Sequence, residues 1–269
     1  MLKLNNISFA DDIDFPHRHS FYQVLYISEG SGEHTIDFEE YRIKKHTLFF
    51  LAPGQVHEWK MAHTSKGMLI NFSELFFSSF LAKNNYIADF NFFLGNGHSS
   101  YVDVSRNHAL IENLFVHMET EYEQCKDCSY DMIRVLLLQL FILVNRSVIG
   151  DAAIPSQRHN YFLVRSFQKL VEQYYTTKRL PRDYAELLFI TPNYLNALCK
   201  KALGRSAGEI IRDRILLEAK RLLINSALFV NEIGWQLKFE DSSYFSRFFK
   251  KYAGVTPEEF RENAGNKKL

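Results

Sequence analysis

The spacing of apolar residues along the chain changes near residue 105. Before that point, β-branched and aromatic residues form short runs separated by turns rich in Gly, Pro, Ser and Glu. Several such runs at spacings of about ten residues predict the strands of a β-sandwich or small barrel. The predicted strands include residues 21–27, 34–38, 41–43, 47–51 and 67–72.

Beyond residue 105 the apolar spacing becomes helical. A first helix, ending near residue 123, is predicted by Leu110, Ile111, Leu114, Phe115 and Met118.

A second helix starts near residue 129 and is apolar around most of its circumference, so every side needs a partner. One side can pack on the barrel. The other side favours a dimer interface, although a helix buried within one subunit explains the pattern equally well.

The stretch 150–157 has the composition of a linker, and only helical patterns follow it. We therefore predict an α+β protein with an N-terminal domain at 1–150, a linker at 151–159 and an all-α domain at 160–269. The net charge is −6 over residues 1–150 and +7 over residues 151–269. This asymmetry suggests that the second domain meets a polyanion.

The overall composition excludes several classes of protein. The hydrophobic fraction is 46% and the charged fraction 23%, values typical of a folded globular chain. No apolar run approaches the roughly 20 residues needed to cross a bilayer, and the N-terminus lacks the pattern of a signal peptide. With only three cysteines, we expect a reduced, cytoplasmic protein without a membrane partner.

The helical domain contains an internal repeat with a period of about 50 residues. Residues 195–204 resemble residues 245–254, and four pairs match outright: Lys200/Lys250, Lys201/Lys251, Gly204/Gly254 and Glu209/Glu259. Each copy reads as a helix-turn-helix, with a short helix, a turn and a capped second helix. Ala185 and Gly234 are the small residues where the two helices approach, and Thr191 and Asp241 are the expected N-caps.

The stretch 232–261 resembles the signature of the AraC/XylS (arabinose-regulator) family of bacterial transcription factors, and 214–223 is similar to the helix that joins its two helix-turn-helix units. The resemblance implies two recognition helices in successive major-groove turns on one face of double-stranded DNA. Carried over position by position, it places base-reading residues at Asn193, Asn196, Ala197, Ser242, Ser243, Ser246 and Arg247.

Side-chain chemistry agrees with several of these positions, because Arg pairs with guanine and Asn with adenine. We expect Lys200, Lys201, Lys250 and Lys251 to bind phosphates, or simply to be solvated at helix ends. Ala197 stands where the family often has Arg, which predicts that the first helix reads fewer bases.

The N-terminal stretches 16–23 and 52–57 resemble the cupin barrel. His17, His19 and His57 match the three metal-binding histidines of that fold, but Gln23 replaces the acidic ligand. An amide is a poor ligand compared with a carboxylate, so we assign no metal and no cofactor. Three histidines without the acid also suit Zn or Ni, which leaves that alternative open. The residues expected to face the barrel and bind a small-molecule effector are His17, His19, Tyr22, His34, Phe50 and His57.

Two functions from different classes remain at this point. The first is a homodimeric, effector-responsive transcription regulator, which would also contact RNA polymerase if it is an activator. The second is a metal-dependent cupin enzyme with a helical appendage. Gln23 and the paired helix-turn-helix units favour the first, without catalysis. Cys125 and Cys128 form a single CxxC motif, without the second cysteine pair that a structural zinc site needs. We therefore expect two free thiols without a redox role.

Overall fold

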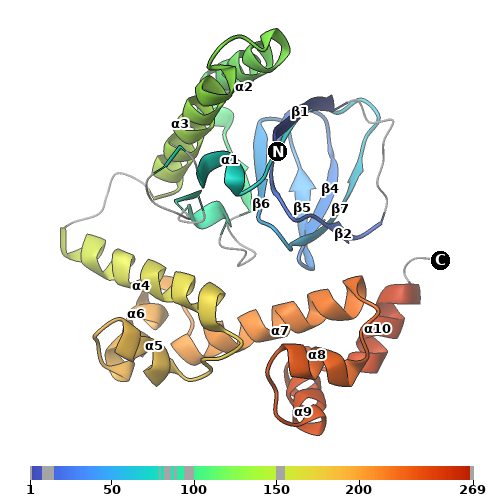
Figure 1. Ribbon diagram of the computed structural model, residues 1–269, viewed down its shortest axis with the longest axis vertical. Helices are drawn as coiled ribbons and strands as arrows, with labels where there is room; N and C mark the ends of the chain where they lie inside the picture. The colour runs from blue at the N-terminus through green and yellow to red at the C-terminus, as the bar shows by residue number, and fades with distance from the viewer. Residues whose placement is uncertain are drawn as a thin grey trace. The chain divides into compact units, whose positions relative to one another are not determined.

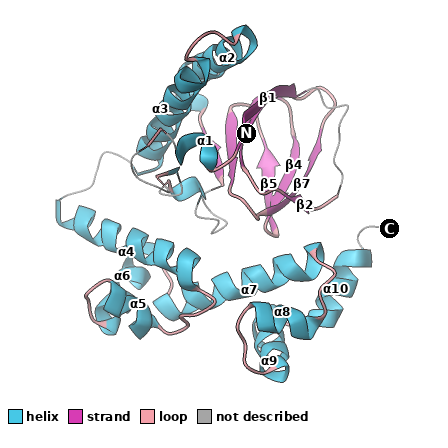
Figure 2. Cartoon of the chain, in the orientation of Figure 1, coloured by secondary structure: helices cyan, strands magenta, loops and turns pink. Residues whose placement is uncertain are grey.

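The computed structural model describes residues 2–7, 15–78, 80–81, 86–87, 90–93, 100–149 and 155–266. The chain divides into two compact units, Met1–Ala152 and Ala153–Leu269. Strands occur in the first unit, whereas the described part of the second is helical (Figures 1 and 2). The predicted α+β class is confirmed. None of the described helices is long and apolar enough to cross a bilayer.

Two antiparallel sheets form the body of the first unit (Figure 2). In spatial order, the first sheet contains β1 (Leu2–Ile7), β8 (Lys66–Phe72), β3 (Tyr22–Glu29), β6 (Thr47–Leu51) and β9 (Tyr101–Asp103). The second contains β2 (His17–Arg18), β7 (Val56–Met61), β4 (Gly32–Ile36) and β5 (Glu39–Ile43).

Strands β3 and β6 are buried on both faces. Leu25 and Phe49 belong to the core between the two sheets, which also includes Trp59. Their neighbours Val24 and Phe50 point the other way, into a larger core under the helices. Because successive side chains of a strand point to opposite faces, one apolar strand serves two cores.

Helices cover the outer face of the first sheet. They are α1 (Leu75–Ser78), the 3-10 turns η2 (Asn91–Phe93) and η3 (Ser105–Asn107), and the hairpin of α2 (His108–Gln124) and α3 (Ser129–Ile149). The predicted hairpin is thus present. Ile111, Leu114, Phe115 and Met118 are buried as expected, but Leu110 is 45% exposed because it lies at the edge of the apolar stripe.

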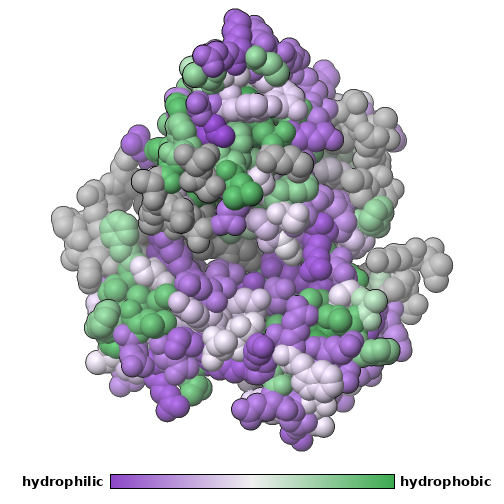
Figure 3. Space-filling model, viewed as in Figure 1, coloured by the Kyte–Doolittle hydropathy of each residue, from purple (hydrophilic) through white to green (hydrophobic). Residues whose placement is uncertain are grey.

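One side of α3 remains uncovered within the unit. Met132 and Val135, one turn apart, are each 47% exposed, whereas Leu137 and Phe141 are fully buried. Figure 3 shows hydrophobic side chains along this part of the hairpin, below its hydrophilic tip. The alternative of a helix buried within one subunit therefore does not agree with the structure, and the dimer interface stays a prediction.

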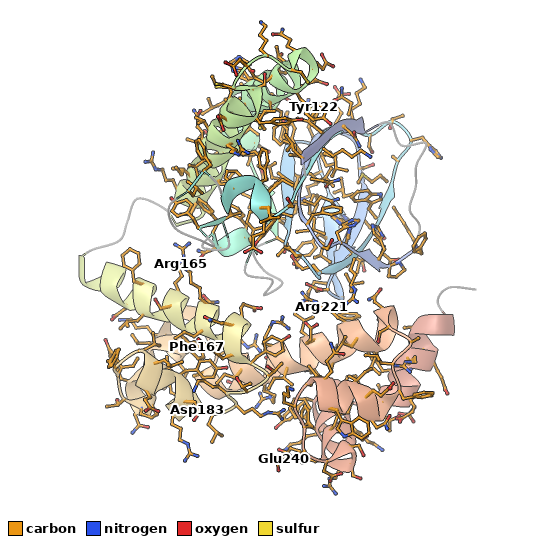
Figure 4. All side chains as sticks on the ribbon, in the orientation of Figure 1. Tyr122, Arg165, Phe167, Asp183, Arg221 and Glu240 are labelled. Atoms are coloured by element: carbon orange, nitrogen blue, oxygen red, sulfur yellow. The ribbon has the colours of Figure 1, made fainter. Side chains whose placement is uncertain are left out.

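The second unit consists of seven helices among its described residues. They are α4 (Pro155–Tyr174), α5 (Pro181–Leu187), α6 (Pro192–Leu203), α7 (Ala207–Asn225), α8 (Val230–Gln236), α9 (Ser242–Ala253) and α10 (Pro257–Asn266). Figure 1 shows α7 running from the α5–α6 pair to the α8–α9 pair. One core joins them, and Phe167 of α4, labelled in Figure 4, is fully buried within it.

Helix α4 begins earlier than the sequence pattern predicts. Residues 155–159 of the predicted linker lie in this helix, and residues 150–154 lie outside the described part of the chain. Pro155 is the first helical residue, a position where its missing N–H leaves no hydrogen bond unmade. A proline that reads as a linker residue therefore starts a helix here.

Both helix-turn-helix units have the local structure that the repeat predicts. Thr191 and Asp241 cap α6 and α9 with their side-chain oxygens. A Cβ on Gly234 would lie 3.3 Å from Cβ of Phe245, which is tighter than ordinary contact and explains the small residue. The predicted positions of caps and close approach are confirmed.

The two turns also contain residues in a conformation that normally favours glycine. Phe189 has a φ of 55° and Lys238 a φ of 59°, and both precede a recognition helix at corresponding positions of the repeat. The Phe189 side chain is 95% exposed, so burial of the ring does not compensate for the strained backbone. The cost of this conformation for a non-glycine residue is about 1–2 kcal/mol.

Replacing Phe189 with glycine is therefore expected to stabilise the helical unit. We expect Phe189→Gly to raise the free energy of unfolding by about 1 kcal/mol, measured by denaturant unfolding of the full chain. Phe189→Ala removes the same exposed ring but keeps the Cβ, and serves as the control. An equal gain in both variants would show that the ring, rather than the backbone, is the source of the strain.

Candidate DNA-binding surface and effector site

Helix α6 presents one exposed face for recognition. Leu195, Leu198 and Cys199 bury the opposite face in the core of the unit. Asn193 and Ala197 lie one turn apart on the exposed face, and both are solvent-accessible. These two predicted base readers are thus available to a groove of DNA.

Helix α9 repeats this arrangement with different chemistry. Phe245 and Phe249 are fully buried, while Ser243 and Arg247 are exposed on the outer face. The Arg247 side chain is 73% exposed, and its nearest carboxylate, that of Asp241, lies 3.9 Å away. An exposed pair of this kind is weak, so the guanidinium can leave it for another acceptor.

The four predicted phosphate binders lie in pairs, one pair in the last turn of each recognition helix. Lys200 and Lys201 end α6, and Lys250 and Lys251 end α9. All four are exposed. Positive charge here also complements the carbonyl end of each helix, so the arrangement is compatible with either phosphate contact or solvation.

Asn196 has a structural role that the sequence did not reveal. Its Oδ1 accepts a hydrogen bond from the backbone N–H of Ala207 at 3.0 Å, which ties α6 to the start of α7. Paired reading of adenine needs that same oxygen as an acceptor. Its role as a base reader therefore stays a prediction, and it competes with this structural contact.

The two serines expected to read bases beside Arg247 are less accessible than Ser243. Ser242 and Ser246 are both half-buried, and Ser246 holds the position in α9 that Asn196 holds in α6. They stay predicted base readers that flank Arg247 on this surface.

A tyrosine at the start of each recognition helix was missed by the sequence analysis. Tyr194 is 42% exposed and Tyr244 is 54% exposed, and they occupy corresponding positions 50 residues apart. The Tyr194 hydroxyl donates a hydrogen bond to Oδ1 of Asn160 in α4 at 3.1 Å. The repeat itself contained this signal, since the tyrosines match at the same offset as the lysine pairs.

The first unit brings four of the predicted effector residues together. His17 on β2 pairs in register with His57 on β7, and His19 follows two residues later. Nε2 of His57 lies 2.9 Å from Nε2 of His19, and Nδ1 of His57 lies 3.1 Å from Nε2 of His34. The rings form a continuous chain from the half-exposed edge of the sheet to a fully buried position.

Burial controls the charge of this histidine cluster. Desolvation, helped by the neighbouring His17, lowers the pKa of His34 to about 3 and that of His19 to about 4. The pKa of His57 is lowered well below its usual value, again chiefly by burial. These three rings are therefore neutral near pH 7.

Tyr22 and Phe50 do not join the histidines, and the prediction that they face the barrel interior is wrong. Tyr22 stacks on Phe72 at 5.3 Å and Phe50 on Phe92 at 4.0 Å, both in the core under the helices. The error arises because β3 and β6 are apolar on both faces, so their sequences do not reveal which side points inward.

Gln23 faces a neighbouring strand. Its Nε2 donates to Oδ1 of Asn71 on β8 at 3.0 Å, while its Oε1 has no hydrogen-bond partner among the described residues. The residue is 2% exposed. The amide that replaces the acidic cupin ligand therefore leaves an unused acceptor inside the barrel.

An open cleft among the described residues lies elsewhere in the first unit. It has a volume of about 640 Å³, four cationic side chains and one acidic side chain, and none of the predicted effector residues lines it. Its lining residues are Gly30, Ser31, Gly32, Glu33, Arg42, Ile43, Lys44, Lys45 and Lys60.

Comparison with known proteins agrees with both halves of the chain. An AraC-like ligand binding domain matches residues 9–142, and a helix-turn-helix domain matches residues 184–263. The chain belongs to the AraC family of transcription regulators. It is thus a DNA-binding transcription regulator with an N-terminal ligand-binding domain.

Similar proteins match nearly the full length of this chain. The HTH-type transcriptional activator RhaR of Escherichia coli K12 is 22% identical over 253 residues, which cover 94% of this chain and 89% of RhaR. The crystal structure of ToxT from Vibrio cholerae O395 is 15% identical, with a TM-score of 0.42, and covers 97% of this chain and 96% of ToxT.

A cationic contact connects the two helix-turn-helix units of this AraC-family chain. Arg179 precedes α5, and its Nη2 donates to the carbonyl oxygen of Leu237 at the end of α8 at 2.7 Å. Its guanidinium lies over the Phe239 ring, with the central carbon 3.9 Å from the ring centroid. That ring contacts Tyr244, Phe245 and Phe248 of α9. Arg179 therefore holds the second recognition helix relative to the first.

Loss of this contact is expected to loosen the spacing between the two DNA sites. For Arg179→Ala we expect the affinity for DNA to depend less on the spacing of its two sites. The difference in affinity between DNA with the preferred spacing and DNA whose spacing is one base pair longer or shorter should become smaller. The lost hydrogen bond and cation–π contact correspond to about 1–2 kcal/mol. Exposed Arg182 provides the control variant Arg182→Ala, which removes the same charge nearby. If both variants keep the wild-type spacing preference, Arg179 does not position the units.

Asn196 is expected to affect stability instead of base preference. Asn196→Ala should lower the free energy of unfolding by about 1 kcal/mol, because the Ala207 N–H loses its acceptor. Asn193→Ala, on the exposed face, should change base preference with little effect on stability. Thermal unfolding and competition binding on variant DNA sites measure the two effects. A changed base preference in Asn196→Ala would support its role as a reader.

Proposed function

We propose that the chain reads two successive major-groove segments on one face of DNA, one with α6 and one with α9. The observation that carries this proposal is the repeated exposed face: Asn193 and Ala197 in the first helix correspond to Ser243 and Arg247 in the second. Helix α7 lies between the two helix-turn-helix units and, at 19 residues, is about 28 Å long. This length suits two sites separated by one turn of DNA, about 34 Å.

The two helices contribute unequally to base reading. Arg247 reaches O6 and N7 of guanine, and Asn193 reaches an adenine. Ala197 contacts at most a thymine methyl group, so the first helix carries less sequence information. Ser242, Ser243 and Ser246 flank Arg247, and the four lysines at the helix ends bind phosphates.

The N-terminal unit supplies the regulation. We infer that a small-molecule effector binds at His17, His19, His34 and His57, where polar rings converge. Among the described residues, Nδ1 of His34 and Oε1 of Gln23 have no hydrogen-bond partner. The exposed apolar side of α3 supports a homodimer through the helical hairpin. Binding would change how the two DNA-binding units of the dimer are presented.

The remaining expectations belong to the same proposal. We place the sensor at 1–150 and the DNA-binding domain at about 160–269, consistent with the division of the chain into two compact units after Ala152. We also infer a cytoplasmic location and no catalytic activity, in keeping with the regulator family. An activator of this kind would contact RNA polymerase in addition.

Selection of binding sites from random duplex DNA tests the proposal. At ~0.15 M salt, where phosphate contacts are weakened, we expect two short motifs about 10 bp apart. Arg247→Ala should cost about 1–3 kcal/mol of binding free energy and relax the preference at one position of the second motif.

Lys250→Ala is the matched control, because it removes a positive charge one turn away on the same helix. It should weaken all sequences about equally and reduce the salt dependence of binding. No enrichment by the full chain, with or without added ligands, contradicts the proposal. An unchanged motif in Arg247→Ala removes that residue from the readout.

A further inference from the structure

The histidine cluster has the geometry of a metal site. One ring nitrogen from each of His17, His19 and His57 lies within 4.8 Å of the other two. His17 and His57 are direct partners across β2 and β7, and His19 is two residues from His17. All three side chains therefore project from the same face of this part of the sheet.

The hydrogen bonds behind these rings leave ligand nitrogens pointing at one another. Nδ1 of His17 lies 3.0 Å from the carbonyl oxygen of Phe15 and donates to it, which leaves Nε2 as a lone-pair donor. Nδ1 of His57 lies 3.1 Å from Nε2 of His34 and can donate there, which frees Nε2 of His57. A metal-binding histidine commonly has such a partner on its second nitrogen.

We propose that His17, His19 and His57 bind a divalent transition metal ion, for which Zn²⁺ is the best fit. Three imidazoles without a carboxylate suit Zn²⁺ and related ions, whereas Mg²⁺ and Ca²⁺ need oxygen ligands. Tetrahedral nitrogens at Zn–N bonds of about 2.0–2.1 Å lie roughly 3.3 Å apart. The 2.9 Å between His19 and His57 needs only a few tenths of an ångström of adjustment, whereas the separations from His17, which reach up to 4.8 Å, must shorten.

A proton occupies the same place when no metal is bound. Both contacts are satisfied in the metal-free protein when His34 donates from Nε2 to Nδ1 of His57 and His57 donates from Nε2 to Nε2 of His19. Metal binding requires the other tautomer of His57 and His34, with no net loss of a proton. His34 Nδ1, which has no partner, then carries its proton. The cost of that tautomer is small beside the binding free energy of a zinc site.

The fourth position of the ion would be open. Gln23, the residue that replaces the acidic cupin ligand, uses its amide nitrogen on Asn71. His17 and His19 are half-exposed, so water can reach the site. A site with three neutral ligands keeps the full charge of the ion, which favours a water or an anionic oxygen as the fourth ligand. The proposal concerns metal binding alone and stands whether or not DNA binding responds.

Titration of the full-length, reduced protein with Co²⁺ tests the site. After chelator treatment, we expect one Co²⁺ per chain with the visible absorption of a tetrahedral nitrogen–oxygen site, displaced by Zn²⁺. His17→Gln and His19→Gln should each weaken binding at least about 10-fold. Both residues are half-exposed, so these variants spare the core that buried His57 supports, and circular dichroism verifies their fold.

Two further variants separate this site from its rivals. His63→Gln removes an exposed histidine of the same unit, and His108→Gln breaks the ring pair with His46, whose centroids lie 4.2 Å apart. Both should bind Co²⁺ like the wild type. The proposal is overturned by absence of stoichiometric binding, by unchanged affinity in His17→Gln and His19→Gln, or by thiolate charge-transfer absorption that Cys125→Ser abolishes.

Discussion

The DNA-binding unit depends on the packing of α7. Ile211 and Ile215 are buried in its first half, and Leu222 and Leu223 in its second, so a single helix contributes to the core of both helix-turn-helix pairs. Its position is reinforced by Arg214, which donates to Glu172 of α4 at 2.6 Å and to Glu218 at 3.0 Å. A rigid helix of this length fixes the distance between the two short recognition helices, α6 and α9.

Charged side chains also stabilise the position of α7. Glu218 also accepts from buried Arg221, which is labelled on α7 in Figure 4. At the C-terminal end, Arg261 of α10 donates to the carbonyl oxygens of Leu223 and Leu228. Breaking a buried pair leaves its partner charge without compensation and costs several kcal/mol. The arginines therefore favour one arrangement of the helices over alternatives with the same apolar pattern.

Most of the fold could be predicted because its signals are local or repeated. The caps Thr191 and Asp241 and the close approach at Gly234 follow from residue chemistry within a few positions. The face of Tyr22 and Phe50 could not be predicted, since a strand buried on both sides has no alternation to read. The structural contact of Asn196 could not be predicted for a related reason: its partner, the Ala207 N–H, lies beyond the helix and depends on tertiary structure.

The same limit applies to the histidines, with the opposite outcome. The sequence placed His17 and His19 two residues apart, but only the register of β2 against β7 shows that His57 stands directly beside them. His34 reaches His57 from β4, on the other side of β7, by a diagonal contact within the second sheet. Through this contact, His34 orients His57, which the two more exposed rings of His17 and His19 contact. This role accounts for a buried, neutral ring in an apolar core whose Nδ1 has no hydrogen-bond partner among the described residues.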